Sequence, residues 1–534
     1  MDYRNKRDLA YSLPKLAVGS SDLLPQKKGL TSTFNLSENV KTTMDFDKLV
    51  PVYHKELYPG DRFEVSINSL TRLAPTVTPI MDNVTTKFFM FWVPNRLLWS
   101  NFTKFMGEKL YPDDTTEYIL PFINLDGTPG LDGVQSLGDY LGIPPDAMRS
   151  NKKISALPFR AYNKIYNDWF RANQLQEPVY ENTGDGGTSV RSYDVLKKGK
   201  PLDYFTGCLP TPQAEGEIKI GLSGNATVKT DVESTRLNLK NGAGVSYVDL
   251  GMQGSTVTNG NPSISKAGND TNLYADMSAV SGISIENLRK AAALQVLLEK
   301  DERSGERYSD LNAVHFGVTT PDFLVGRSQF LGSISNPLVI NPITQNTSTD
   351  STSPQGNLAG VGLGLQDNFL GECSAPEHGI LMVLACTSSE INYQQGIHRD
   401  WFKSNRFDYM FPSLWNLGEQ AVYNREIYAT YSNRDEWDDV FGYQERFMEL
   451  RQGINRVSGK MRSGVNGSLD IWQLAEEFGE TPKLNGEFIE LNTPIERVLA
   501  VQDEPALIMD INIEVKAERP LPLESNPSLL AGKL

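Results

Sequence analysis

Phe88-Phe89-Met90-Phe91-Trp92-Val93, six apolar residues in a row, is the stretch that decides the fold class. Pro94 follows directly, so the run has the length and the boundary of a β-strand. A strand without alternating polar residues is typically buried on both faces. The run Gly379-Ile380-Leu381-Met382-Val383-Leu384 has the same character. The sequence therefore predicts at least two strands that are covered on both sides.

Two other stretches alternate apolar and polar residues, the pattern of a strand with one buried face. Phe63-Glu64-Val65-Ser66-Ile67-Asn68 is one of them, and residues 510–517 are the other. Arg519-Pro520-Leu521-Pro522 stops the second strand, because proline donates no ladder hydrogen bond. We expect both stretches to cover a core with one face and to meet solvent with the other.

Long segments between these strands carry apolar residues at helical spacing. The expected helical faces are Leu98 with Phe102 and Phe105, Tyr162 with Tyr166 and Trp169, Ile285 to Val296 behind the cap Ser284, and residues 469–478 behind the cap Ser468. A few strands joined by very long excursions are unusual in an enzyme. They suit a β-sandwich whose loops carry the function.

Two of these excursions differ in composition from the rest of the chain. Residues 214–276 are rich in Gly, Ser, Thr and Asn and nearly lack large aromatic residues, so they cannot support a large core alone. They are either a flexible linker or a β-rich protrusion that symmetry mates stabilise. Residues 344–364 are predicted to be a surface loop. This loop includes Gly360-Val361-Gly362-Leu363-Gly364, which lacks the spacing of a dinucleotide-binding motif.

The chain of 534 residues is acidic, with 51 Lys and Arg against 66 Asp and Glu, a net charge of −15. Such a protein repels nucleic acid unless a basic patch is segregated from the rest. Residues 1–30 form a locally basic arm, which is either a frayed terminus or a segment that lies against something anionic. The basic residues of the arm are Arg4, Lys6, Arg7, Lys15, Lys27 and Lys28, against Asp2, Asp8 and Asp22.

The three cysteines, Cys208, Cys373 and Cys386, lie far apart and form no metal-binding pattern, which predicts free buried thiols in a reducing compartment. No apolar run has the length of a membrane helix. The N-terminal residues 1–16 contain no apolar core of a secretory signal, so we expect the protein to fold in a cytoplasm.

The sequence singles out no catalytic residue, cofactor or metal site. It contains no nucleotide-binding P-loop, zinc-protease or nucleophile-elbow motif, and its four histidines lack ligand spacing. Hard cations such as calcium prefer carboxylate oxygens, so one ion at an interface is an interpretation of the acidic cluster Asp435, Glu436, Asp438 and Asp439. A solvated charged face is the simpler interpretation.

Several blocks, met in order along the chain, resemble the major capsid proteins of the Microviridae, closest to the gokushovirus-like group. The resemblance is weakest over residues 214–283 and 333–376. The blocks that carry it include Lys41-Thr42-Thr43-Met44-Asp45, Tyr58-Pro59-Gly60-Asp61-Arg62-Phe63, Phe91-Trp92-Val93-Pro94-Asn95-Arg96-Leu97-Leu98-Trp99, Asp203-Tyr204-Phe205-Thr206-Gly207-Cys208-Leu209-Pro210, Gly305-Glu306-Arg307-Tyr308 and Phe441-Gly442-Tyr443-Gln444-Glu445-Arg446.

This resemblance implies a mainly β fold, an eight-stranded jelly-roll sandwich of the viral capsid type with long, partly helical loop insertions. It implies a structural protein and not an enzyme. Residues 31–534 would form a discontinuous capsid domain that assembles, through pentamer and threefold contacts, into a T=1 icosahedral shell of about sixty copies. Such a shell forms in the bacterial cytoplasm and encloses a circular single-stranded DNA genome. The implied partners are a small basic DNA-binding viral protein, scaffolding and minor spike or pilot proteins, and a host receptor.

The resemblance also gives functions to two segments. The arm, residues 1–30, is expected inside the shell, where Arg4, Lys6, Arg7, Lys15, Lys27 and Lys28 would face DNA. Residues 214–276 are the candidate for an exposed spike at the threefold axis that attaches to the host. Its candidate attachment residues are Glu217, Lys229, Arg236, Tyr247 and Asp249.

Two alternatives remain at this point, a carbohydrate-active β-sandwich enzyme and a lectin-like carbohydrate-binding module. Neither accounts for the ordered blocks, and particle formation would exclude both. Two aromatic segments, Trp99-Ser100-Asn101-Phe102 and Arg406-Phe407-Asp408-Tyr409-Met410-Phe411, have the composition of a subunit interface. Each of them fits packing within the subunit equally well.

Overall fold

The computed structural model separates the chain into two compact units, residues 1–212 with 305–534, and residues 213–304. The structure describes residues 31–523 except 110, 112–115, 126–132, 148–149, 151, 189–192, 214–226, 231–237, 242–243, 248–262, 265–272, 277–284, 305–306, 320, 347, 350–353 and 416. In this described part, no helix is both long and apolar enough to span a membrane.

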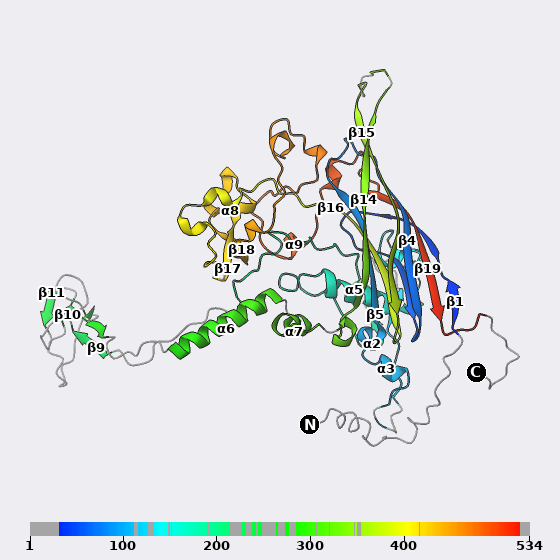
Figure 1. Cartoon of the computed structure of the whole chain (residues 1–534), viewed down its shortest axis with the longest axis horizontal. Helices are drawn as coiled ribbons and strands as arrows, with labels where there is room; N and C mark the ends of the chain where they lie inside the picture. Colours follow the sequence, from blue (N-terminus) through cyan, green and yellow to red (C-terminus); the bar gives the residue numbers. More distant parts are fainter. Residues whose placement is uncertain are drawn as a thin grey trace. The chain divides into compact units, whose positions relative to one another are not determined.

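The first unit is built around one curled antiparallel sheet with two halves (Figure 1). The first half has the strand order β2–β19–β4–β15. The second half has the order β3–β16–β5–β14. The strand bounds of the first half are β2 Glu38–Met44, β19 Leu507–Arg519, β4 Arg62–Leu73 and β15 Leu358–Ser374, and those of the second are β3 Val50–Leu57, β16 Gly379–Ser389, β5 Val84–Pro94 and β14 Gln329–Thr344.

Successive strands of the chain alternate between the two halves, except that β5 and β14 are neighbours in the second half, which is the topology of a jelly roll. The halves are joined along one side, where Val339–Thr344 of β14 pair with Leu358–Leu363 of β15. A ninth strand, β1 (Ser32–Asn35), pairs with the same strand, β19, as β2 does, but farther along it. β1 and β2 are therefore two pieces of one edge position, and the prediction of an eight-stranded jelly roll is confirmed.

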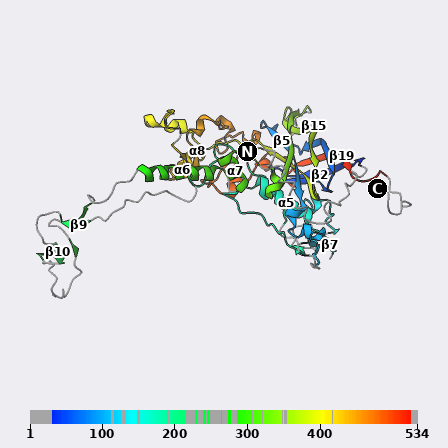
Figure 2. The same cartoon turned by 60° about the horizontal axis from the view of Figure 1, so that its bottom comes forward.

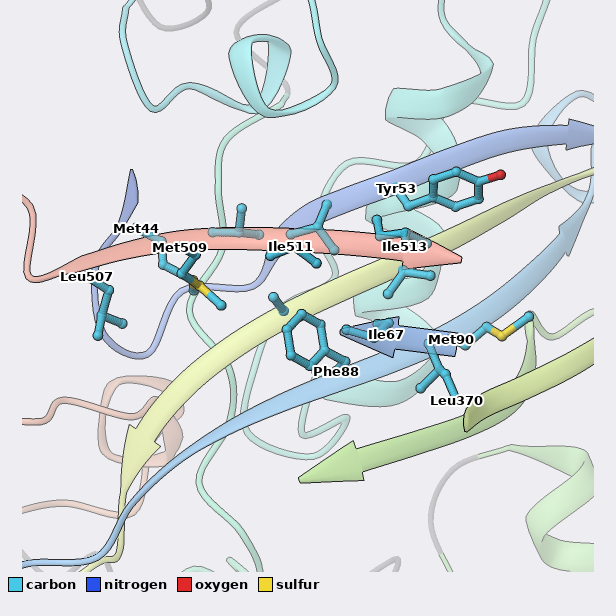
Figure 3. Close-up of a cluster of buried hydrophobic side chains, with 14 of the residues drawn as sticks. Met44, Tyr53, Ile67, Phe88, Met90, Leu370, Leu507, Met509, Ile511 and Ile513 are labelled. Atoms are coloured by element: carbon cyan, nitrogen blue, oxygen red, sulfur yellow. The ribbon is translucent and has the colours of Figure 1, made fainter. Parts of the chain in front are cut away.

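The main core fills the space between the two halves (Figure 3). Phe63, Val65 and Ile67 of β4 contribute to it from one half, and the alternate residues Ile511 and Ile513 of β19 lie beside them. The intervening residues of both strands are more exposed, as the alternating sequence pattern predicts. The second half contributes its own alternate residues, which are Phe88, Met90, Trp92, Leu381, Val383 and Ala385.

A second core covers the other face of β5 and β16, so these strands are buried on both sides as predicted. Phe91 and Val93 of β5 point into it, together with Met382 and Leu384 of β16. Helical segments of the β5–β14 connection form its outer layer, and Figure 2 shows α5 next to this part of the sheet. These segments are α2 Asn95–Leu98, α3 Phe102–Phe105, α4 Leu137–Tyr140, α5 Leu157–Ile165 and a π-helix, Tyr166–Phe170.

A third core lies between the β5–β14 connection, which contributes Tyr204 and Phe205, and the connection that follows β16, which contributes Val422 and Ile427. The hairpin β17 (Glu419–Tyr423) and β18 (Val440–Glu445) supports it. The remaining elements of the first unit are α7 Tyr308–Phe316, α8 Asn424–Ile427, α9 Gly486–Ile489, a small sheet of β6 Phe122–Leu125, β7 Lys152–Ser155 and β8 Gly187–Thr188, and short 3-10 helices at Asp322–Val325, Arg399–Phe402, Arg406–Asp408, Tyr431–Glu436, Met448–Leu450, Gly459–Met461, Asp470–Trp472 and Ile495–Arg497.

The predicted helix over residues 469–478 is wrong, because only a 3-10 turn, Asp470–Trp472, forms after the cap Ser468. Tertiary partners take the backbone groups that a longer helix would use. The Leu474 amide donates to the Asp82 carboxylate, and Arg497 donates to the Gln473 and Ala475 carbonyls. The Leu474 amide has a single hydrogen to donate, so its bond to Asp82 replaces the helical bond to the Asp470 carbonyl.

The prediction of a surface loop over residues 344–364 is wrong for its last part, since residues 358–364 belong to β15. Close packing explains the glycines in this part of β15. A Cβ on Gly362 would lie 2.7 Å from the Leu73 Cβ, and one on Gly360 would lie 2.3 Å from the Thr76 Oγ1. Gly-rich composition here reflects a close approach of neighbouring segments within a strand.

The helical predictions in the connections are partly confirmed. Tyr162 lies in α5, and Tyr166 and Trp169 lie in the π-helix that continues it. Leu98, Phe102 and Phe105 lie on two short helices, because the intervening Ser100 amide bonds to the Thr183 carbonyl. The predicted helix that begins at residue 285 is present in the second unit as α6 (Ile285–Ser304), and its expected cap Ser284 lies outside the described residues.

The second unit also contains short strands. A two-stranded sheet pairs β9 (Thr227–Thr230) with β13 (Leu273–Asp276). A three-stranded sheet has the order β11–β10–β12, with the bounds Gly244–Tyr247, Asn238–Asn241 and Ser263–Ile264. The whole unit is inserted in the long connection between β5 and β14.

Candidate assembly surface

The two aromatic segments that have interface-like composition have opposite surroundings. Trp99 is fully buried and Phe102 is 9% exposed, and both belong to the second core. The second predicted segment, 406–411, is in contrast largely exposed. It lies within a wider segment, residues 399–417, in which Trp401 is 82% exposed and Trp415 is 60% exposed. Further large apolar side chains of this exposed aromatic segment also meet solvent, namely Phe407, Tyr409, Met410, Phe411 and Leu417. Such a patch is typical of a protein–protein contact.

Local hydrogen bonds give the exposed aromatic segment a defined backbone. The Asn405 side chain accepts a hydrogen bond from the Phe407 amide at 2.8 Å and caps a 3-10 helix, Arg406–Asp408. The Asp408 carboxylate accepts from the amides of Ser404 and Asn405, each at 2.8 Å. These donors lower the pKa of Asp408, because they stabilise the ionised carboxylate. The aromatic side chains are thus presented on a folded loop.

A buried carboxylate, Glu426 of α8, anchors the start of this segment. Arg399 donates to Glu426 Oε1 at 3.0 Å and to the Ala421 carbonyl at 2.7 Å. The Tyr204 hydroxyl donates to Glu426 Oε2 at 2.8 Å. Burial raises the pKa of Glu426, and Arg399 partly opposes that rise. The network ties the exposed aromatic segment to the third core.

A second arginine, Arg425, supports the segment from the side. Its guanidinium lies 4.1 Å from the centre of the Phe402 ring and 4.8 Å from that of Tyr423, which are cation–π distances. Arg425 also donates to the Asp438 carboxylate. Stacking of this kind keeps Phe402 half-buried while its neighbour Trp401 projects into solvent.

The acidic cluster at 435–439 is largely engaged by protein groups. Asp438 accepts from Arg425, and Glu436 accepts from the Thr481 hydroxyl. Asp435 is almost fully exposed beside Arg434. Within the described ranges, no three His, Cys, Asp or Glu side chains gather as metal ligands would. The arrangement fits the simpler interpretation, a solvated charged face.

A junction that the sequence analysis missed lies at Asp168 in the π-helix. Its carboxylate accepts from the Ser328 amide at 2.7 Å and from the Ser328 hydroxyl at 2.8 Å. Lys164 and Arg307 pair with the same carboxylate at 3.0 and 3.5 Å. The i,i+4 spacing of Lys164 and Asp168 was a local signal, but the partners at 307 and 328 are brought there only by the tertiary fold. The junction fixes the chain where it returns from the inserted unit to β14.

The predicted site residues fall mostly outside the described part of the chain. This holds for the six DNA-facing residues, Arg4, Lys6, Arg7, Lys15, Lys27 and Lys28, and for Glu217, Arg236 and Asp249 of the candidate spike. Lys229 lies on β9, opposite Tyr274 of β13. Tyr247 lies on β11, opposite Asn238 of β10, so these two candidates belong to different small sheets.

The three cysteines are free and buried, as predicted. Each belongs to a different core, Cys373 to the first, Cys386 to the second and Cys208 to the third. Burial raises the pKa of both Cys373 and Cys386 to about 12, so their thiols stay protonated at neutral pH.

Comparison with known proteins agrees with the fold. A family model described as "Capsid protein (F protein)" matches residues 25–529. The capsid protein VP1 of Bdellovibrio phage phiMH2K is 38% identical over 93% of this chain and 95% of its own length. VP1 of Chlamydia phage 1 is 35% identical over 97% and 98%, and VP1 of Spiroplasma virus 4 is 34% identical over 90% and 92%. The chain therefore belongs to the F-protein family of Microviridae capsid proteins, and is a structural protein of a bacteriophage virion.

Proposed function

We propose that this capsid protein assembles into a T=1 icosahedral shell of about sixty copies around a circular single-stranded DNA genome. The observation that carries the proposal is the exposed aromatic segment 399–417, which a folded base presents to solvent on a jelly-roll subunit. The two large indoles, Trp401 and Trp415, are the expected anchors of a contact with another copy. Many weak contacts of this kind close one particle and allow errors to be corrected.

Electron microscopy of the protein, expressed alone and with its neighbouring viral genes, tests this proposal. Closed uniform shells support it, and isolated subunits under both conditions contradict it. A double substitution, Trp401→Ser with Trp415→Ser, should abolish shells or shift assembly to higher protein concentration. Leu365→Ser is the matched control, since Leu365 is equally exposed but lies on β15 away from the segment.

For the inserted unit, we propose attachment to the host cell at the threefold axis. The supporting features are its place as one excursion of the β5–β14 connection and its two small sheets, which contain the candidates Lys229 and Tyr247. Deletion of residues 217–274 should leave shells intact and reduce adsorption to host cells. Failure of shells to form would instead give the unit a structural role.

For the arm, we propose a place inside the shell against the packaged DNA. The support is its local positive charge on a protein of net charge −15, which needs a segregated basic segment to meet phosphate. A separate small basic viral protein would supply the remaining neutralisation. Residues 1–30 should resist protease in intact particles, and ready cleavage there would contradict the proposal. Scaffolding, minor spike or pilot proteins are expected helpers, and co-expression with the neighbouring genes tests the need for them.

Family membership leaves no role for the carbohydrate-active enzyme that the strand pattern alone had left open. A carbohydrate-binding function is compatible with a capsid only as part of host attachment. The adsorption experiment with the 217–274 deletion therefore covers it.

A further inference from the structure

A large cleft of about 1610 Å³ opens along one side of the jelly roll. β2 of the first half-sheet and β3 of the second both line it. The two halves are joined at their other side by β14 and β15, so the cleft is the unjoined side of the sandwich. Its volume exceeds that of a usual small-molecule pocket and suits a length of polypeptide.

The cleft exposes apolar surface that a folded protein normally covers. Phe105 and Met106 from the segment after α2, Leu120 before β6, and Ile508 of β19 all line the cleft, and each is between 40% and 58% exposed. Tyr53 of β3 also lines the cleft, but its side chain is almost fully buried in the main core (Figure 3). A row of exposed apolar side chains in one cleft indicates a missing occupant that offers apolar side chains of its own.

The backbone at the cleft is also incomplete. β2 pairs only with β19 and β3 only with β16, so among the described residues neither has a strand on its outer edge. Open strand edges beside an apolar surface invite an added extended segment, and proteins generally cover them.

The arm begins next to this cleft. Ser32, the first residue of β1, pairs with Arg519, and Arg519 lines the cleft. Residues 9–18 of the arm read Leu-Ala-Tyr-Ser-Leu-Pro-Lys-Leu-Ala-Val, the most apolar part of the first thirty residues. Residues 19–31 connect this stretch to β1 and can span roughly 40 Å. That exceeds the length of β3, which at eight residues is about 26 Å.

We propose that residues 9–18 of the arm occupy the cleft of their own subunit and cover the open edges of β2 and β3. Leu13 and Leu16 would fill the apolar floor, and backbone groups of the stretch would meet the strand edges. Arg4, Lys6 and Arg7 precede the stretch and Lys27 and Lys28 follow it, so these five remain available to bind DNA, whereas Lys15 would lie at the cleft. The inference therefore does not rest on the proposed contact with DNA.

A photo-crosslinking amino acid at Met106 of the full-length protein tests the occupant directly. After irradiation and trypsin digestion, mass spectrometry should find the crosslink in peptides 8–15 or 16–27, on a chain that migrates as a monomer. The matched control places the same amino acid at Ile343, which is similarly exposed at the β14–β15 end of the sheet and should not capture the arm. Capture of the C-terminal residues 520–533, a dimer-sized product, a different viral protein, or reaction with water alone would each overturn the proposal.

Arm variants separate specific docking from chance proximity. Leu13→Asp combined with Leu16→Asp should reduce the crosslink by about tenfold or more, because charge at the apolar floor is unfavourable. Ser12→Asp adds a charge to the same stretch at a polar position and should leave the yield within about twofold. Equal capture by the leucine variant and the wild type would overturn the proposal, whatever the result of the DNA-contact experiment.

Discussion

The segments 99–102 and 399–417 share an aromatic composition but differ in burial: the first is packed inside the subunit and the second faces solvent. Trp99 lies beneath the helical layer, donates its indole N–H to Asp185, and packs against Phe102 with ring centres 6.2 Å apart. Trp401 projects from a loop and is largely exposed. The difference follows from the sheet, because β5 and β16 have apolar residues on both faces and their outer face needs a cover. The connection that directly follows β5 supplies that cover, and the later segment stays exposed on the subunit.

Substitution of Trp99 and of Trp401 should show the largest contrast, because the first side chain stabilises the subunit and the second is expected to support shell formation. Trp99→Ala should lower the free energy of unfolding of the unassembled subunit by about 3–5 kcal/mol, since it empties a fully buried site. Trp401→Ala should change it by less than about 0.5 kcal/mol but weaken shell formation. Urea unfolding measures the first effect and sedimentation of assembly mixtures the second. A large loss of subunit stability in Trp401→Ala would contradict the division.

The anchor beneath the exposed aromatic segment should give the next largest effect. Arg399→Met leaves the buried Glu426 carboxylate without its cation and should cost about 3 kcal/mol near pH 7. Burial raises the pKa of Glu426, and loss of Arg399 raises it further. A raised carboxyl pKa makes the folded state gain stability as pH falls from that pKa toward the usual value of the unfolded chain. The cost of Arg399→Met should therefore shrink on acidification, and urea unfolding at several pH values checks this. A cost independent of pH would point to lost packing alone.

The same contrast between a buried and an exposed position can be tested in strand β15. Gly362→Ala should destabilise the subunit by about 1–3 kcal/mol, because the new methyl would meet Leu73 and Leu338. Val361→Ala, at the adjacent and more exposed position, should cost less than about 1 kcal/mol. Thermal unfolding of both variants measures the difference. Similar losses in the two would show that β15 tolerates extra volume.

The reaction rates of the buried thiols show which core opens, and this is the smallest of the four expected effects. Cys386 shares the second core with Trp99, so Trp99→Ala should speed its reaction with iodoacetamide by about tenfold relative to Cys373. Trp401→Ala should leave all three thiols as slow as in the wild type. Mass spectrometry of timed samples resolves the sites. Equal acceleration of the three thiols in Trp99→Ala would indicate global unfolding instead of opening of one core.

The sequence by itself determined the strands and their faces. The apolar run 88–93 and the alternating stretch 510–517 specify local burial, because side chains alternate across any strand. The basic arm, the free thiols and the family resemblance also follow from residues in order. The jelly roll was predicted from the family resemblance and not from local pattern. Its strand pairings join residues hundreds of positions apart, as between β2 and β19.

Only the tertiary structure decided where similar compositions go. Residues 358–364 look like a loop and form a strand, because neighbouring segments leave no room for side chains at Gly360 and Gly362. Residues 469–478 look like a helix but form only one 3-10 turn, because the Leu474 amide bonds to Asp82 and Arg497 binds the carbonyl of Ala475. Of two equal aromatic segments, one is buried and one is exposed. Each outcome depends on a partner distant in sequence, and local pattern contains no information about which partner the fold brings near.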